Sequence, residues 1–239
     1  MRDAVNISIY CGQKFIDMLD FPLAVEYARN FILQRHLNNG VFIEDINNTC
    51  IDFDVKIAKN AKINRFCVLK GNTEIGENTL IFASDINDSK LGENIICNSS
   101  TLIGATVGDK TTIGPYAYLR QNCVIGENCR IGDFVEIKNS SIGGGSKVSH
   151  LAYVGDATIG EKVNVGCGVV FVNYDGKNKN RTTVGDGSFL GSNCNFVAPL
   201  SIGKNVFVAA GSTVTKNLLD NDFCIARERE YIKHDWKRS

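Results

Sequence analysis

Aliphatic residues recur at every sixth position over much of this chain. One unbroken run starts at Ile51 and ends at Ile81, and a second starts at Val184 and ends at Val214. Between them the spacing continues in shorter stretches separated by one-residue slips. The aliphatic positions of these stretches are Ile113, Leu119, Ile125, Ile131 and Ile137, then Ile142, Val148 and Val154, then Ile159, Val165 and Phe171. The residue two positions before the aliphatic one is often small, as at Ala61, Cys67, Thr73, Thr79, Cys123, Cys129, Thr182, Ser188, Cys194 and Ser212.

A period of six fits neither an amphipathic helix nor a simple alternating strand. It is typical of a parallel β-helix, in which short strands wind into coils and each coil buries its apolar edge against the next. The pattern therefore predicts an all-β, single-stranded β-helix of hexapeptide repeats, with four of the cysteines serving as small core residues.

The two ends of the chain depart from this period. Asp20-Phe21-Pro22 can start a helix with Pro in its first turn, and good helix formers continue to Leu37 before Asn38-Asn39-Gly40 ends it. From Asn217 the period dissolves into a charged segment. We expect a helical arm over 1–48, the β-helix over 49–216 and an irregular charged tail over 217–239.

Composition narrows the classes of partner. At 44% hydrophobic the chain can bury a sizeable core, and its 26 Lys and Arg balance its 26 Asp and Glu. This balance favours neither nucleic acid nor an anionic membrane surface. The start of the chain has no apolar signal segment, and no stretch reaches the roughly 18 apolar residues of a membrane span. The nine Cys include no CxxC pair that would hold zinc. We expect a cytoplasmic protein with reduced thiols and no bound metal.

A β-helix is filled by its own side chains, so a binding or catalytic site must lie on its outer faces. We expect such a site where the six-residue period slips. His150 lies in this region, and a neutral imidazole suits proton removal from an amine or hydroxyl. A surface or packing histidine is the alternative. Arg120 and Lys138 are three hexads apart, which is one full coil. They should therefore stack as a candidate anion site, unless they are simply solvated surface charges.

Longer motifs in the same region match a known family. The segments VEIKNSSIGGGSKVSHLAYVGDATIGEKVNVGCG, NYDGKNKNRTTVGDGSFLGSN and VAPLSIGKNVFVAAGSTVTKN begin at residues 135, 173 and 197. They closely resemble the acetyltransferase half of the bifunctional N-acetylglucosamine-1-phosphate uridyltransferase/glucosamine-1-phosphate acetyltransferases, within the hexapeptide-repeat acyltransferase superfamily. The match is dense from IGPYAYLR to Arg227 and looser through the helical arm.

The resemblance implies a left-handed parallel β-helix that forms a homotrimer with active sites between subunits, and acetyl-CoA as co-substrate. It implies that His150 is the general base and that Glu136 orients it. The sugar phosphate would be held by Arg120, Lys138, Tyr153 and Lys179, and the sugar by Asn164. Contacts to acetyl-CoA would come from Cys167, Asn173, Tyr174, Ser192, Ala210 and Arg227.

Two departures from the family pattern leave the chemistry in place. Cys167 stands where the family commonly has Ala, and Gln121 replaces a usual Pro. The uridyltransferase half is absent from this chain, so we expect no uridyl transfer, although a separate uridyltransferase is a candidate partner.

The expected reaction is acetyl transfer from acetyl-CoA to the 2-amine of glucosamine-1-phosphate, which serves UDP-N-acetylglucosamine and peptidoglycan precursor synthesis. A different amino-sugar or nucleotide-sugar acceptor and a non-catalytic scaffold for a nucleotidyltransferase are the alternatives. Cys167 as a covalent acetyl carrier is the alternative mechanism.

Overall fold

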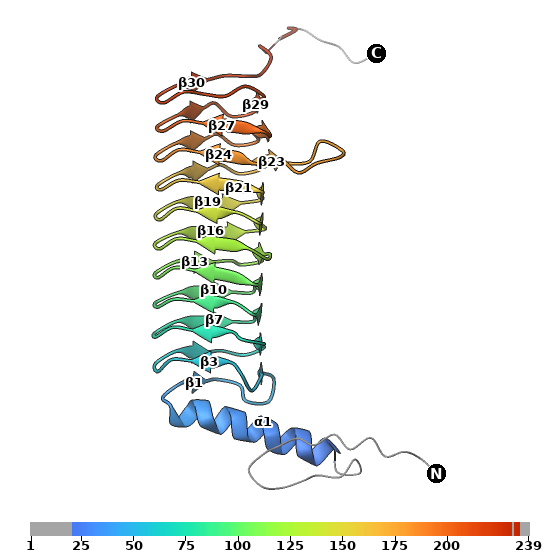
Figure 1. The fold of residues 1–239 in the computed structure, drawn as a ribbon, viewed down its shortest axis with the longest axis vertical. Coiled ribbons are helices and arrows are strands. Elements are labelled where there is room, and N and C mark those ends of the chain that lie inside the picture. The colour runs from blue at the N-terminus through green and yellow to red at the C-terminus, as the bar shows by residue number, and fades with distance from the viewer. Residues whose placement is uncertain (1–20, 231, 235–239) are drawn as a thin grey trace, which may run out of the picture.

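The chain winds into a tall three-sided prism of stacked coils with one helix beneath it (Figure 1). The computed structural model describes residues 21–230 and 232–234. Every pair of adjoining strands is parallel, and the strands form three sheets, one on each side of the prism. The predicted left-handed parallel β-helix is confirmed.

The first face is an 11-stranded sheet. Its strands are β1 (Phe42–Ile43), β4 (Lys62–Ile63), β7 (Leu80–Phe82), β10 (Ile96–Asn98), β13 (Thr112–Ile113), β16 (Arg130–Asp133), β19 (Lys147–His150), β22 (Asn164–Val165), β25 (Phe189–Leu190), β28 (Phe207–Val208) and β30 (Phe223–Cys224). The second face is a 10-stranded sheet. Its strands are β2 (Cys50–Ile51), β5 (Val68–Lys70), β8 (Asp85–Asn87), β11 (Thr101–Ile103), β14 (Tyr118–Leu119), β17 (Glu136–Lys138), β20 (Tyr153–Gly155), β23 (Val170–Val172), β26 (Asn195–Val197) and β29 (Thr213–Val214).

The third face is a nine-stranded sheet. Its strands are β3 (Lys56–Ile57), β6 (Glu74–Ile75), β9 (Lys90–Leu91), β12 (Ala105–Val107), β15 (Cys123–Ile125), β18 (Ser141–Ile142), β21 (Ala157–Ile159), β24 (Thr182–Val184) and β27 (Leu200–Ile202). Successive strands of the chain occupy the three faces in turn, so one coil contributes one rung to each face.

The core is the stack of hexad residues that the sequence predicts. All the aliphatic positions of the two long runs and the shorter stretches are buried. The small residues two positions earlier are buried as well, including the four cysteines assigned to the core. Cys97 is a fifth, and burial raises the pKa of its thiol to about 12, which makes it chemically inert. Thr79 shows how a polar residue fits there, because its hydroxyl donates to the Gly92 carbonyl at 2.9 Å and accepts from the Ile95 amide at 3.1 Å.

The slips in the period are changes in coil length. Tyr118 pairs with Glu136 on the next coil, and Glu136 pairs in turn with Tyr153, so the second of these coils is shorter by one position. The coil that leads from Val170 to its partner Asn195 is far longer. Its extra residues leave the prism as a single loop between β23 and β24, which Figure 1 shows standing out from the stack.

The β-helix extends beyond both predicted boundaries. At the start, β1 pairs with β4, so the first coil begins at Phe42 and not at 49. At the end, β30 pairs with β28, so the last rung reaches Cys224 and not 216. The six-residue period does not reveal β1 and β30, because irregular loops separate these strands from the regular repeats. The parts of the predicted arm and tail at 1–20, 231 and 235–239 lie outside the described residues.

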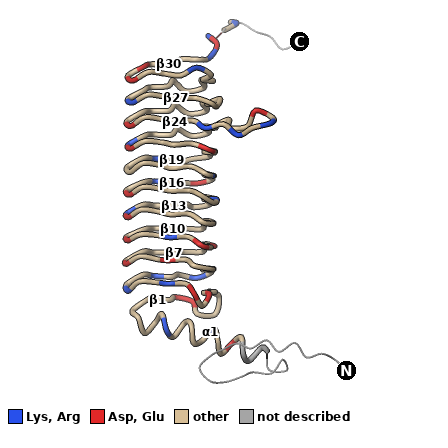
Figure 2. The backbone as a smooth tube through the Cα atoms, viewed as in Figure 1, with Lys and Arg blue, Asp and Glu red and all other residues tan. Residues whose placement is uncertain are grey.

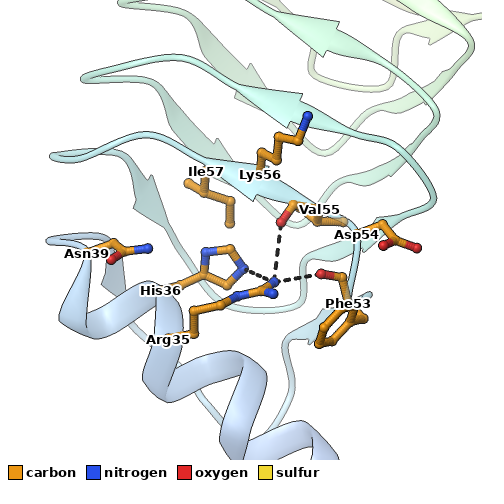
Figure 3. Close-up of a pocket in the computed structure, with 8 residues that line it drawn as sticks. All are labelled: Arg35, His36, Asn39, Phe53, Asp54, Val55, Lys56 and Ile57. Carbon is orange, nitrogen blue, oxygen red and sulfur yellow. Dashed lines mark hydrogen bonds between the residues drawn. The ribbon is translucent and has the colours of Figure 1, made fainter. Parts of the chain in front are cut away.

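The predicted helix is α1 (Phe21–Asn38), and it ends where Gly40 adopts a left-handed φ of 80°. Its last turn covers the first coils through His36, whose side chain is only 2% exposed. Arg35 Nη2 donates to the carbonyl of Phe53 at 2.7 Å and lies 3.4 Å from His36 Nε2, as Figure 3 shows beside a cavity of about 340 Å³. His36 Nδ1 is buried without a hydrogen-bond partner.

This burial predicts a pH-dependent attachment of α1. Burial, and then the neighbouring Arg35 charge, lower the pKa of His36 from 6.5 to about 4. When the helix is unfolded, His36 is protonated below pH 6.5. When the helix is packed, His36 is protonated only below about pH 4. Stability falls as the pH is lowered through this window, by up to roughly 3 kcal/mol, and no further loss from His36 occurs below it.

Amide hydrogen exchange in α1, corrected for intrinsic rates, measures the effect between pH 6.5 and pH 4.5. We expect protection of α1 to fall in the wild-type chain and to stay constant in His36→Leu. His234→Gln, which alters an exposed histidine of the tail, is the matched control and should behave as wild type. An unchanged pH dependence in His36→Leu would contradict the assignment.

Candidate functional site

The projecting loop over residues 173–181 is an ordered hairpin. Tyr174 and Lys179 form an antiparallel bridge, and the Asn180 amide donates to the Asn173 carbonyl at 2.7 Å. The Asp175 carboxylate caps the tip by accepting from the backbone amides of Lys177 and Asn178 at 2.8 and 2.7 Å. Figure 2 shows that the loop carries charges of both signs well away from the prism. The polar composition of this segment thus makes a defined structure.

A buried carboxylate, Asp156, fastens the base of this loop. Its two oxygens accept hydrogen bonds from the side-chain amides of Asn139 and Asn173, each at 2.5 Å, and its carbonyl accepts from the Thr182 amide at 3.2 Å. Burial alone would raise the pKa of Asp156, but the two amides and the nearby ammonium groups of Lys138 and Lys179 hold that pKa below its usual value. Asp156 is therefore ionised and joins both ends of the loop to the coil below.

Three cations converge where the loop joins the prism, one of them from the loop itself. The pKa of Lys138 is lowered, first by the adjoining ammonium of Lys179, then by burial and by Arg120. Arg120 and Lys138 occupy successive rungs of the second face, as their spacing of three hexads predicts. Like charges held this close repel one another, and a bound dianion would relieve that repulsion. The arrangement is suited to a phosphate group.

Tyr153 and Asn173 complete this cluster. Asn173 Nδ2 lies 3.5 Å from the Tyr153 hydroxyl, and both groups cover Gly155 so closely that a Cβ there would lie 2.5 Å from the Tyr153 oxygen. Gly155 is needed for this close approach. It was not expected from the sequence, because a glycine in a repeat that is rich in glycine carries no signal of its own.

His150 stands at the corner between the first and second faces, and its partner is Asp133. His150 Nδ1 lies 2.5 Å from Asp133 Oδ1. Glu136 instead forms an ion pair with Arg120 at 2.9 Å, and this contact raises the pKa of the guanidinium. Among the described residues of one chain, no hydrogen bond joins Glu136 to His150, so the expected orienting role of Glu136 stays a prediction. Glu136 lies past the corner on the second face. It stacks on Tyr118 of the coil below, which places it within reach of Arg120 on that same coil.

Four of the six residues expected to contact a coenzyme form a ladder up the same corner, whereas Asn173 and Tyr174 are in the projecting loop. Backbone hydrogen bonds link Gly168 to the His150 carbonyl, Asn193 to the Cys167 carbonyl and Gly211 to the Ser192 carbonyl. These bonds stack His150, Cys167, Ser192 and Ala210 on consecutive coils. Arg227 follows one coil later, with its Cδ 3.5 Å from where a Cβ of Gly211 would lie. At about 4.8 Å per coil, this corner ladder spans about 19 Å from His150 to Arg227.

One chain divides the expected site between two faces. The cation cluster, Tyr153 and Asn173 lie on the second face, whereas Asn164 points outward from the first face, in register between Lys147 and Phe189. Among the described residues no hydrogen bond joins Asn164 to the cluster. Outward side chains on two faces of a prism point in different directions, so one small ligand cannot contact both sets in a single chain.

Other kinds of site receive no support from the described residues. None of their acidic, His and Cys side chains gather in threes as metal ligands would. The single helix of the described part is not apolar enough to cross a membrane. No hydrogen bond connects the Cys167 thiol with His150 in this part of the chain.

Sequence comparison identifies the repeats of this chain and its relatives. The description "Bacterial transferase hexapeptide (six repeats)" matches residues 104–139 and 181–216. These two stretches carry the hexapeptide repeats of bacterial transferases. It is 47% identical over 214 residues to the bifunctional protein GlmU of Clostridium beijerinckii and 48% identical over 244 residues to that of Clostridioides difficile. These matches cover 89% and 99% of this chain but 47% and 53% of the relatives, so the chain spans about half of their length.

A solved structure of similar fold is the UDP-N-acetylglucosamine acyltransferase of Francisella novicida. It superposes with a TM-score of 0.51 at 20% identity, over 74% of this chain and 62% of that chain. At this identity the likeness supports the β-helix fold alone.

Proposed function

We propose that this hexapeptide-repeat protein moves an acetyl group from acetyl-CoA to the 2-amine of glucosamine-1-phosphate. The observation that carries the proposal is the convergence of Arg120, Lys138 and Lys179 at one end of the second face, whose other end adjoins the corner of the exposed His150. An anion site and a base suit an acceptor that carries both a phosphate and an amine. The near 50% identity to the GlmU proteins supports the same acceptor.

The cation cluster binds the sugar phosphate. Arg120 presents a planar guanidinium that Glu136 holds in place, and the two lysines add point charges. The hydroxyl of Tyr153 and the amide of Asn173 lie beside them as hydrogen-bonding groups. Hydrogen bonds to a charged group contribute about 1.5 to 3 kcal/mol each, so the phosphate is a major part of acceptor recognition.

His150 takes the proton as the amine attacks. The amine nitrogen forms a bond to the thioester carbonyl carbon, the C–S bond breaks, and the proton from nitrogen passes to His150 Nε2. The departing thiolate then takes a proton and leaves as free coenzyme thiol. Holding both reactants in line supplies much of the rate, and this step calls for no metal.

Acetyl-CoA lies along the corner ladder. The ladder offers a narrow track of small residues from His150 upward and ends at the cation of Arg227, which suits an extended thiol arm with phosphates at its far end. Cys167 is one rung of that track, next above His150. Its replacement by Ala should preserve activity if transfer is direct, and abolish it if the thiol carries the acetyl group.

The active enzyme is a homotrimer that completes each site between two subunits. Its support is the division of the expected acceptor contacts between the first and second faces of one chain. Sedimentation should give three chains per particle. A monomer that is fully active would overturn the shared site.

The direct test is a thiol-release assay with acetyl-CoA and a panel of amino sugars. We expect kcat/KM for glucosamine-1-phosphate to exceed that for glucosamine by at least about 10²-fold, because the neutral sugar forfeits two or more charge-assisted hydrogen bonds. Lys138→Ala should raise KM for the phosphate and shrink this preference. Lys90→Ala, on the third face, is the matched control. Equal turnover of both sugars, or preference for a nucleotide sugar, would overturn the proposed acceptor, and no turnover of any sugar would favour a scaffold.

A further inference from the structure

Asp133 is joined to His150 by the backbone as well as by its side chain. The two residues end β16 and β19, and they pair directly in the parallel register of the first face. The Asp133 carbonyl also accepts a hydrogen bond from the Leu151 amide at 3.0 Å. Their relative position is therefore set by the sheet and does not depend on a mobile side-chain contact.

The chain has unusual local features that produce this pairing. β16 and β19 are the only four-residue strands among the described elements, so this pair of rungs alone extends as far as the corner. Gly132 permits the close approach, because a Cβ there would collide with the Ser149 carbonyl oxygen. Beyond the paired residues, Phe134 and Leu151 turn the corner with left-handed φ angles of 54° and 48°.

The charges around the pair favour an ionised Asp133. The pKa of Asp133 is lowered, first by its hydrogen bond with His150, then by its own backbone amide and by the charge of Arg130. The other titratable groups near the ring are Lys147, earlier on its own strand, Cys167 on the coil above, and Tyr153 past the corner. Asp133 is the carboxylate in contact with the imidazole, since Glu136 is engaged with Arg120.

We propose that Asp133 is the positioning residue for His150, fixing the ring with its proton on Nδ1 so that Nε2 faces outward as the acceptor. A carboxylate on one ring nitrogen determines which tautomer is present and how the ring is turned. This inference rests on the proposed acetyl transfer for its kinetic consequence. Its structural consequence, the tautomer, is measured without any substrate.

The first measurement is the ring ¹⁵N chemical shifts of His150 at a pH where the ring is neutral. The chain has three histidines, so His36→Leu and His234→Gln assign the signals by subtraction. We expect the wild-type ring to hold its proton on Nδ1, and Asp133→Ala to shift the ring toward the Nε2-protonated form. Asp133→Asn retains an oxygen acceptor and should keep the wild-type pattern. Identical ring shifts in wild type and Asp133→Ala would overturn the proposal.

The second measurement separates this role from a merely structural one. In Asp133→Ala we expect kcat to fall about 10- to 100-fold with KM for both substrates within about twofold, and Asp133→Asn to restore most of the rate. Glu74→Gln, an ion-paired carboxylate on the third face, is the control and should leave kcat unchanged. A rise in KM with unchanged kcat would also overturn the proposal. If neither the wild type nor any variant turns over the sugar, the proposed function fails. The tautomer measurement then still decides the role of Asp133.

Discussion

Replacing His150 with Ala is expected to lower kcat for acetylation of glucosamine-1-phosphate by about 10²- to 10⁴-fold, the usual contribution of a general base. The side chain is half exposed at the corner and supports no part of the core, so the variant should fold as the wild type does. KM for either substrate should change little, because the phosphate cluster and the corner ladder remain. Initial rates of thiol release, measured over a range of concentrations of both substrates, give kcat and the KM for each substrate.

The matched control for this variant is His234→Ala in the tail, which should keep the wild-type rate. A second arm raises the pH, since an amine that is already deprotonated needs less help from a base, and the gap between wild type and His150→Ala should narrow. If His150→Ala acetylates the sugar at the wild-type rate, His150 is not the base.

Removing the projecting loop should have the second large effect. Excision of residues 174–181 joins Asn173 to Thr182 and makes this coil as long as the one that leads from Glu136 to Tyr153. The new corner then reads Val172-Asn173-Thr182, which imitates Lys138-Asn139-Ser140, where Asn139 turns the corner with a φ of 47°. The prism should therefore close without strain, and thermal unfolding should show a cooperative transition like that of the wild type.

Activity should not survive this excision. The change removes Tyr174 and Lys179, the expected contacts to coenzyme and phosphate, and the loss of two charge-assisted contacts lowers kcat/KM by about 10²- to 10⁴-fold. Lys177→Ala at the tip of the loop is the control, because its side chain is exposed and has no assigned contact. A shortened protein with wild-type kcat/KM would show that the loop has no part in the reaction.

Several parts of the molecule could be predicted because they depend on spacing along the chain. Arg120 and Lys138 stack because one coil contains three hexads. The buried residue of each hexad could be predicted because a period of six is typical of a coiled β-helix. The end of α1 follows from Asn and Gly, which favour the left-handed turn found at Gly40. These are local rules, and each needs only a short stretch of chain to apply.

Other parts could not be predicted from spacing. Asp133 and Glu136 precede His150 by 17 and 14 residues, and both are carboxylates that the sequence offers as partners of the ring. The choice between them depends on which residue ends its strand at the corner and which one a stacked guanidinium captures. Asp156 likewise gains its role only because the stacked coils place Asn139 and Asn173, each 17 residues away in the chain, against its two oxygens.

The sequence by itself therefore determined the β-helix, its core and the identity of the reactive side chains, because a repeated pattern of buried and small residues admits one way of stacking. Only the tertiary structure decided which carboxylate meets His150, how the loop is fastened, and that the expected acceptor contacts fall on two faces. Those outcomes depend on side chains from different coils meeting in space, and the unequal lengths of the coils change which ones meet.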